Sequence, residues 1–255
     1  MINLMAEDKF PTGVVELDRL LGGGVHRGVN ILVKGATGTG KTTFALQFLV
    51  DGASRGERGM YFTFEESGDQ VIKYGSKFFP GLSTHLKSKV LQIIDFTTRK
   101  TGDAKMVQGD KVIIPSKQVV NSTAYIEDRI LDIRGQTIQR VVIDGLQTFA
   151  TTFYDLSGQR DVEELRRTLS KILLLLKNEG ITTYVISEEA DEQPDKYGFI
   201  NFTADGIFVL RVTEALDVRT MKIMKMRGIN HTLKPLTMQL TEGEGVTLVQ
   251  QHQYK

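Results

Sequence analysis

An eight-residue segment near the N-terminus constrains the fold of this chain more than any other feature. It fits the pattern G-x-x-x-x-G-K-[ST] and reads Gly35-Ala36-Thr37-Gly38-Thr39-Gly40-Lys41-Thr42. Apolar residues 29–33 predict a buried strand before it, and residues 42–49 predict a helix after it. In this setting glycines let several backbone N–H groups point at phosphate oxygens, and the helix N-terminus adds positive potential. The segment predicts a triphosphate-binding loop in an α/β domain.

Two side chains of this phosphate loop (residues 35–42) have specific predicted roles. Lys41 would reach the β- and γ-phosphates, and the Thr42 hydroxyl would hold Mg²⁺. The predicted cofactors are thus a nucleoside triphosphate and Mg²⁺. The candidates for nucleotide binding around the loop are Gly35, Ala36, Thr37, Gly38, Thr39, Gly40, Lys41, Thr42 and Thr43.

Strand-like and helix-like segments alternate along the chain. Apolar runs predict further strands at residues 60–64, 90–94, 141–143 and 181–186. Such near-continuous runs are typical of strands buried on both faces of a parallel sheet. Apolar positions spaced by three and four residues predict helices over 119–133 and 162–176. This alternation predicts an α/β fold with a mainly parallel central sheet flanked by helices.

The last quarter of the chain changes character. Residues 205–212, 218–226 and 236–240 resemble strands with short connections, and we expect an antiparallel extension at one sheet edge. Residues 97–117 are polar, with five Lys/Arg against two Asp, and fit no strong period. We therefore expect a mobile, irregular excursion there.

Bulk properties narrow the classes of protein. No Pro/Gly/Ser-rich linker divides the 255 residues, so we expect one domain over residues 1–255. The net charge of +1 favours no class of partner, and the lack of cysteine excludes disulfides and thiolate metal sites. No signal peptide or bilayer-length apolar run is found, so we expect a cytoplasmic protein without a membrane partner.

Asp144 is the candidate second metal ligand. It ends the apolar run at residues 141–143, and the carboxyl ends of such strands are where open α/β sheets bind ligands. There it would hold the water shell of Mg²⁺ rather than touch phosphate. A strand-end Asp can instead cap the following turn, but the upstream phosphate loop favours the metal role.

Two adjacent carboxylates, Glu65 and Glu66, follow the predicted strand at residues 60–64. Neighbouring side chains point in different directions, so at most one of them can face the phosphate. One could polarise the attacking water while the other orients it, which requires some upward tuning of the pKa. From the residues alone, an exposed acidic helix start explains the pair equally well.

A third candidate group lies far along the chain. Lys225 and Arg227 would share one face of a strand, and His231 follows beyond a glycine. Because they are distant in sequence from the phosphate loop, a neighbouring subunit could present them to a triphosphate. From sequence alone an ordinary solvated strand face is the more common explanation.

These motifs, in this order, resemble one family. The segments that carry the resemblance are Phe10-Pro11-Thr12-Gly13, Glu16-Leu17-Asp18-Arg19-Leu20-Leu21-Gly22-Gly23-Gly24-Val25, the phosphate loop, Glu65-Glu66, Val142-Ile143-Asp144, and Lys225-Met226-Arg227-Gly228 with His231. They extend over nearly the whole chain and resemble the KaiC-family ATPases of the RecA-like superfamily.

The resemblance implies a RecA-like fold and an ATPase that forms a homo-hexameric ring with ATP between subunits. It implies a regulatory or signalling role with a protein partner that the sequence does not identify. The catalytic residues it implies are Glu65, Glu66, Lys41 and Arg227. The residues it implies as contacts to ATP on the adjacent subunit are Lys225, Arg227 and His231. Ser187 is similar in placement to a residue that senses the γ-phosphate.

One departure from the family bears on activity. The clock member of the family carries two such domains, and in the second an adjacent Ser-Thr pair is autophosphorylated. The matching positions here are Asn201 and Phe202, which have no hydroxyl, although nearby Thr203 leaves a shifted site open. We expect no clock-type autokinase cycle.

A DNA-handling relative of RecA is the main alternative. In such proteins the loops after the fourth and fifth strands touch DNA. Here residues 145–160 hold one Asp and one Arg, while residues 188–203 hold five acids against one Lys. A phosphate polyanion needs Lys and Arg along its path, so we expect no nucleic-acid partner. Only the basic residues of the 97–117 segment favour DNA.

A non-catalytic module that uses ATP only to assemble a ring is the third alternative. It would keep Lys41 and Thr42 but turn ATP over negligibly. The presence of Glu65, Glu66 and Asp144 argues against it.

Overall fold

The structure, a computed structural model, describes residues 9–97, 105–108, 111–113, 137–154, 159–188 and 197–249. Its strands are β1 (Lys9–Phe10), β2 (Val25–His26), β3 (Asn30–Gly35), β4 (Arg58–Thr63), β5 (Leu91–Asp95), β6 (Lys105–Gln108), β7 (Lys111–Ile113), β8 (Ile138–Asp144), β9 (Thr182–Glu188), β10 (Gly206–Thr213), β11 (Val218–Met226), β12 (Leu236–Thr241) and β13 (Gly245–Val249). Its helices are α1 (Val15–Leu20), α2 (Lys41–Ser54), α3 (Gly68–Phe78), α4 (Leu82–Lys87), α6 (Leu146–Phe153), α7 (Gln159–Asn178), α8 (Phe199–Thr203) and the short 3₁₀ helix η3 (Glu214–Leu216).

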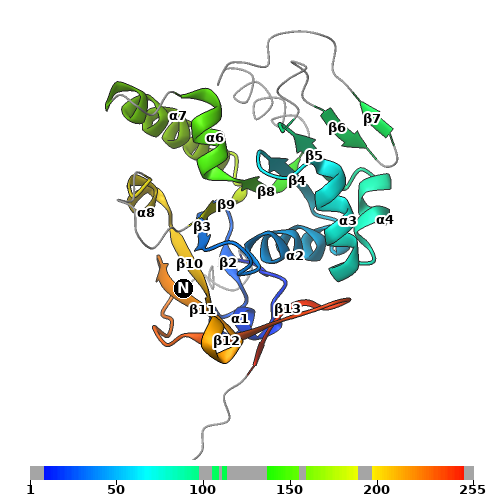
Figure 1. The fold of residues 1–255 in the computed structure, drawn as a ribbon, viewed down its shortest axis with the longest axis vertical. Helices are drawn as coiled ribbons and strands as arrows, with labels where there is room; N and C mark the ends of the chain where they lie inside the picture. The colour runs from blue at the N-terminus through cyan, green and yellow to red at the C-terminus, as the bar shows by residue number, and fades with distance from the viewer. Residues whose placement is uncertain are drawn as a thin grey trace, which may run out of the picture.

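One large sheet organises the described part of the chain. Its strand order is β13-β12-β11-β10-β3-β9-β8-β4-β5-β6-β7. The six strands from β10 to β5 are parallel to one another. β11, β12 and β13 extend one edge of the sheet with antiparallel pairing, and β6 and β7 extend the other edge in the same way. β3, which leads into the phosphate loop, lies centrally between β10 and β9 (Figure 1).

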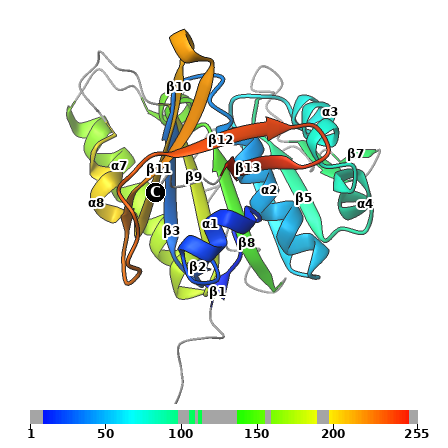
Figure 2. The same ribbon diagram turned by 90° about the horizontal axis from the view of Figure 1, so that it is seen from below.

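Helices cover both faces of this sheet. Figures 1 and 2 show α2, α3 and α4 on one side and α6, α7 and α8 on the other. Successive side chains of β8 point to opposite faces of the sheet, because side chains alternate along a strand. Val142 packs in the cluster that includes α2, while Val141 and Ile143 pack in the cluster that includes α7.

Most of the predicted elements are confirmed. The predicted parallel strands correspond to β3, β4, β5, β8 and β9, and the predicted helices over 42–49 and 162–176 are the central parts of α2 and α7. The antiparallel C-terminal extension is confirmed for β11 and β12, with β13 as a strand that the sequence did not predict. β10, which was expected in that extension, instead pairs in parallel with β3. The predicted helix over 119–133 lies outside the described residues.

The prediction of an irregular excursion over residues 97–117 is wrong for its described strands. β6 pairs with β5 and β7 pairs with β6, both antiparallel, so this polar segment extends the sheet. β6 and β7 have only four and three residues, which is too short for an alternating pattern to mark them in the sequence. Across the described residues, no helix has the length and apolarity needed to cross a membrane.

Candidate active site

The phosphate loop has the backbone shape that the motif requires. β3 ends at Gly35 and α2 begins at Lys41, with Gly38 and Gly40 at φ values of 79° and 97°. These positive φ values favour glycine. A Cβ atom at Gly35 would lie 2.4 Å from the Leu210 carbonyl oxygen, whereas one at Gly38 would meet nothing within 4 Å. The loop is thus tight where it leaves the sheet and open where a phosphate would lie.

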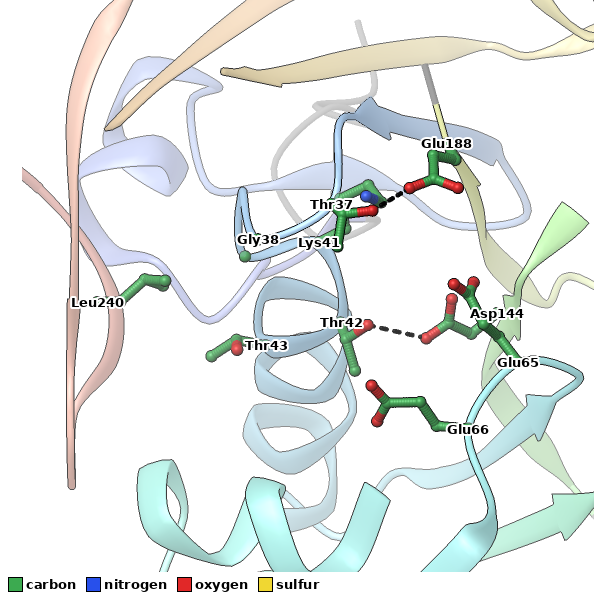
Figure 3. Close-up of a pocket in the computed structure, with 11 residues that line it drawn as sticks. Thr37, Gly38, Lys41, Thr42, Thr43, Glu65, Glu66, Asp144, Glu188 and Leu240 are labelled. Carbon is green, nitrogen blue, oxygen red and sulfur yellow. Dashed lines mark hydrogen bonds between the residues drawn. The ribbon is translucent and has the colours of Figure 1, made fainter. Parts of the chain in front are cut away.

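A pocket of about 270 Å³ lies beside this loop. It is lined by Thr37, Gly38, Gly40, Lys41, Thr42, Thr43, Glu65, Glu66, Asp144, Glu188 and Leu240. Figure 3 shows the carboxylates of Glu65 and Glu66, which follow β4, and those at the ends of β8 and β9 facing the start of α2. The structure therefore brings together most of the predicted phosphate and metal residues with both predicted catalytic glutamates.

Asp144 lies next to Thr42 at the floor of the pocket. The Thr42 hydroxyl donates to Asp144 Oδ2 at 3.0 Å, as the dashed line in Figure 3 shows. The Tyr61 hydroxyl donates to the same oxygen. Burial raises the pKa of Asp144, and the hydrogen bonds from Tyr61 and Thr42 oppose that rise. Burial and the adjacent Asp144 charge raise the pKa of Tyr61 well above its ordinary value, so its hydroxyl remains a donor.

Glu65 and Glu66 follow β4 and line the pocket, with Glu65 beside Asp144. Gly145, at a φ of 96°, lets Glu65 approach closely, because a Cβ there would lie 3.1 Å from the Glu65 Cβ. Burial raises the pKa of Glu65 most, and the charges of Asp144 and Glu188 raise it further. Burial, then Glu65, raise the pKa of Glu66. The pair thus has the upward tuning that a group activating water needs.

Lys41 is the cation of this pocket. Its Nζ donates to the Ala36 carbonyl oxygen at 2.8 Å. Burial lowers the pKa of Lys41, and the carboxylates of Glu188, Asp144 and Glu65 oppose that change. Glu188, at the end of β9, also accepts a hydrogen bond from the Thr37 hydroxyl. The pocket therefore holds four carboxylates against one ammonium group.

The donor set fits Mg²⁺ bound together with phosphate. Mg²⁺ keeps several waters and is usually held by one or two carboxylates plus substrate phosphates. Here a hydroxyl, Thr42, and a carboxylate, Asp144, lie side by side at the phosphate loop. Among the described residues, no three His, Asp or Glu side chains converge as a metal site by themselves. A metal held jointly by phosphate oxygens, water and these two residues is the arrangement that this chemistry allows.

The distant cations are not in this pocket. Within the described part of the chain, Lys225, Arg227 and His231 are absent from its lining. Lys225 Nζ donates to the carbonyl oxygens of Asn201 and Ala204 at 2.9 and 2.5 Å. Arg227, just beyond β11, is more than half exposed and pairs with Asp205 at 3.2 Å.

Ser187 is buried and belongs to a small network with α6. Gln147 Nε2 donates to Ser187 Oγ at 2.9 Å and to the Glu188 carbonyl oxygen at 2.6 Å. Ser187 itself is not among the described residues that line the pocket. The neighbouring Glu188 faces the phosphate loop instead.

Sequence reasoning missed four residues of the site. Glu188 had a usable signal, because it follows a predicted strand in the same way as Asp144. Tyr61 had no such signal, since aromatic residues are common in strands. Its contact with Asp144 depends on the pairing of β4 with β8, which places Thr63 opposite Asp144. Gly145 and Leu240 are likewise identified only by the folded structure.

Comparison with known proteins agrees with this geometry. A family model described as "ATPase: KaiC" matches residues 10–253. The chain belongs to the KaiC ATPase family. It is therefore a P-loop NTPase, and the resemblance inferred from its motifs is confirmed.

Individual KaiC relatives show how far the likeness extends. The circadian clock oscillator protein KaiC of Thermostichus vulcanus is 33% identical over 228 residues, 88% of this chain and 41% of the relative. That of Prochlorococcus marinus is 30% identical over 251 residues, 96% of this chain and 46% of the relative. The chain thus spans less than half the length of these curated relatives.

A solved structure of a KaiC-like protein confirms the fold. The crystal structure of a KaiC-like protein from Pyrococcus horikoshii OT3 matches with a TM-score of 0.71 and 26% sequence identity. The match covers 95% of this chain and 99% of that one. The predicted RecA-like α/β fold is therefore confirmed.

Proposed function

We propose that this chain is a Mg²⁺-dependent ATP hydrolase. The observation that carries the proposal is the single pocket that joins the phosphate loop, the Thr42–Asp144 pair and Glu65–Glu66. Phosphoryl transfer needs positioning, a metal ion and a group that orients the attacking water, and this pocket holds candidates for each.

Each residue has a defined part in the proposed reaction. Backbone N–H groups of the phosphate loop bind the β- and γ-phosphates, and the Lys41 ammonium neutralises charge on them. Thr42 and Asp144 would hold Mg²⁺, which supplies charge neutralisation when bound. Glu65 is the candidate that takes the proton from the attacking water, because the charges of Asp144 and Glu188 add to burial in raising its pKa. Glu66 orients that water by hydrogen bonding.

The proposal extends to a homo-hexameric ring in which Lys225, Arg227 and His231 contact ATP on the neighbouring subunit. Two features support it: the described lining of the pocket is acidic with Lys41 as its one cation, and the exposed Arg227 side chain is not part of that lining. A cation donated in this way can raise the rate about 10³- to 10⁵-fold. We further propose that turnover serves a regulatory protein partner, without nucleic acid and without autokinase activity.

Calorimetry with ATP and Mg²⁺ tests the central proposal. The unaltered protein should bind ATP, Lys41→Ala should lose most of that affinity, and Asp144→Asn should bind ATP but lose the dependence on Mg²⁺. Lys73→Ala, on the exposed side of α3, is the matched charge control and should bind like the unaltered protein. Folded, unaltered protein without affinity for Mg²⁺-ATP would refute the proposal.

A further inference from the structure

Tyr61 occupies an unusual place for a core aromatic residue. It lies on β4, is 1% exposed and belongs to the hydrophobic cluster that includes α2. Its hydroxyl nevertheless donates to Asp144 Oδ2, the oxygen that also accepts from Thr42. The carboxylate is thus held from the core side by one hydroxyl and from the phosphate-loop side by another.

This arrangement fixes which Asp144 oxygen is available to a ligand. Both hydroxyls are donated to Oδ2, and among the described residues Oδ1 accepts no hydrogen bond. Asp144 lines the pocket, whereas Tyr61 is not in the described lining. Tyr61 therefore acts on the pocket through side chains that line it, chiefly the Asp144 carboxylate that accepts its hydrogen bond.

A second buried tyrosine gives the matched comparison. Tyr61 and Tyr184 lie on either side of β8, where both pair in register with Val142. Tyr184 is 0% exposed and belongs to the same cluster. Its hydroxyl has no hydrogen-bond partner in the described structure, whereas that of Tyr61 is committed to Asp144.

We propose that Tyr61 is a positioning residue for the metal: its hydroxyl fixes the Asp144 carboxylate so that Oδ1 faces the Mg²⁺-bound water. The proposal rests on the proposed function, because it assigns a task at the same site. Outer partners that orient a metal ligand typically change metal affinity about 10- to 100-fold when removed.

The test measures metal binding rather than turnover. Mn²⁺ is titrated, with free Mn²⁺ followed by electron paramagnetic resonance, into protein saturated with a non-hydrolysable ATP analogue. Tyr61→Phe should weaken Mn²⁺ binding about tenfold or more. Tyr184→Phe, which removes the same atom from the matched position, should leave it unchanged. Affinity for the analogue in EDTA should be equal in all three proteins, which also shows that the site is folded.

A double-mutant cycle separates positioning from a general packing effect. In an Asp144→Asn background, Tyr61→Phe should cause no further loss of Mn²⁺ affinity, because the carboxylate that it orients is gone. Equal Mn²⁺ affinity of the two Phe variants, or full additivity with Asp144→Asn, would overturn the proposal. Failure of the unaltered protein to bind the analogue would instead refute the proposed function.

A measurement on protein that keeps Tyr61 tests the proposal even if Tyr61→Phe folds poorly. With ring-¹³C tyrosine, adding Mg²⁺ to the analogue-bound protein should shift a buried tyrosine resonance that neither Tyr154→Phe nor Tyr184→Phe removes. The absence of any such shift would also overturn the proposal.

Discussion

Glu65 and Glu66 are adjacent in sequence but differ in what surrounds them. Burial, Asp144 and Glu188 raise the pKa of Glu65, and Lys41 partly opposes this. For Glu66, burial and then the Glu65 charge raise the pKa. Since a base that takes a proton from water must be ionised, the proposed role of Glu65 predicts that the hydrolysis rate depends on pH through this residue.

We expect the hydrolysis rate to fall on acidification at a higher pH than the ordinary glutamate pKa of about 4.3 implies. A raised pKa means that Glu65 takes up its proton earlier as the pH falls. The native state then binds more protons than the unfolded state between the two pKa values, so this group stabilises the fold as the pH falls there. The measurement is kcat between pH 4.5 and 8, with circular dichroism to show that the protein stays folded.

Two variants identify the titrating group in that profile. Glu65→Gln should lower kcat at least about 100-fold and remove the acidic limb, because a general base contributes about 10² to 10⁴ in rate. Glu66→Gln should lower kcat less and keep the limb. An acidic limb at the ordinary glutamate value, or wild-type turnover in Glu65→Gln, would contradict the assignment.

The role of a single residue could be predicted when the residues that act with it lie close to it in the sequence. Lys41 and Thr42 were predicted because one contiguous motif fixes both their spacing and their setting. Tyr61 could not be predicted, because its contact with Asp144 spans 83 positions in the chain and depends on the pairing of β4 with β8. A strand aromatic and a functional hydroxyl look the same before that register is known.

Among the elements, α2 connects the phosphate loop to both ends of the described chain. Gln47 on this helix donates to the carbonyl oxygens of Gly13 and Val246 at 2.6 and 3.0 Å, and it accepts from the Val246 N–H at 2.6 Å. Val246 lies on β13, which pairs with β12, and Leu240 on β12 lines the pocket. One buried amide thus ties the C-terminal hairpin to the helix that begins at Lys41.

Gln47→Leu should lower the free energy of unfolding by about 2 kcal/mol, since a buried polar group left without a partner costs about 1–3 kcal/mol. Urea unfolding measures this change. Hydrogen exchange should show the largest loss of protection in β13. Gln239→Leu, on the exposed face of β12, is the control and should shift stability by about 0.5 kcal/mol or less. Equal effects of the two substitutions would show that Gln47 does not join these elements.

The success of element prediction follows the amount of apolar surface that each element buries. β3, β8 and β9 are covered on both faces, and their apolar runs were sufficient to predict them. β6 and β7 lie at the far edge of the sheet and have only four and three residues, so no sequence pattern marked them. Edge strands are held by backbone pairing, which the side-chain pattern does not report.

For the whole molecule, charge is distributed unevenly between two sites. The pocket has four carboxylates around Lys41, while Lys225 and Arg227 lie at the end of β11, where Asp205 and backbone carbonyls hold them. Burial raises the pKa of Asp205, but its hydrogen bonds with Lys177, Asn30 and Arg227 bring that pKa below its ordinary value. The sequence predicted these cations but not the groups that hold them, because those contacts depend on the pairing of β11 with β10.

Mixing two inactive variants tests whether those cations act across an interface. Lys41→Ala protein lacks a working pocket, and Arg227→Ala protein should lose about 10³-fold in rate if its arginine stabilises the transition state. In a ring mixed at equal amounts, about a quarter of the interfaces join an intact pocket to an intact arginine, because each interface uses one face from each subunit. Turnover should therefore recover to about a quarter of the wild-type rate. A mixture of Lys41→Ala with the Lys41→Ala/Arg227→Ala double variant has no intact pocket and should stay inactive. If native mass spectrometry shows mixed rings while turnover does not recover, Arg227 does not act on the neighbouring subunit.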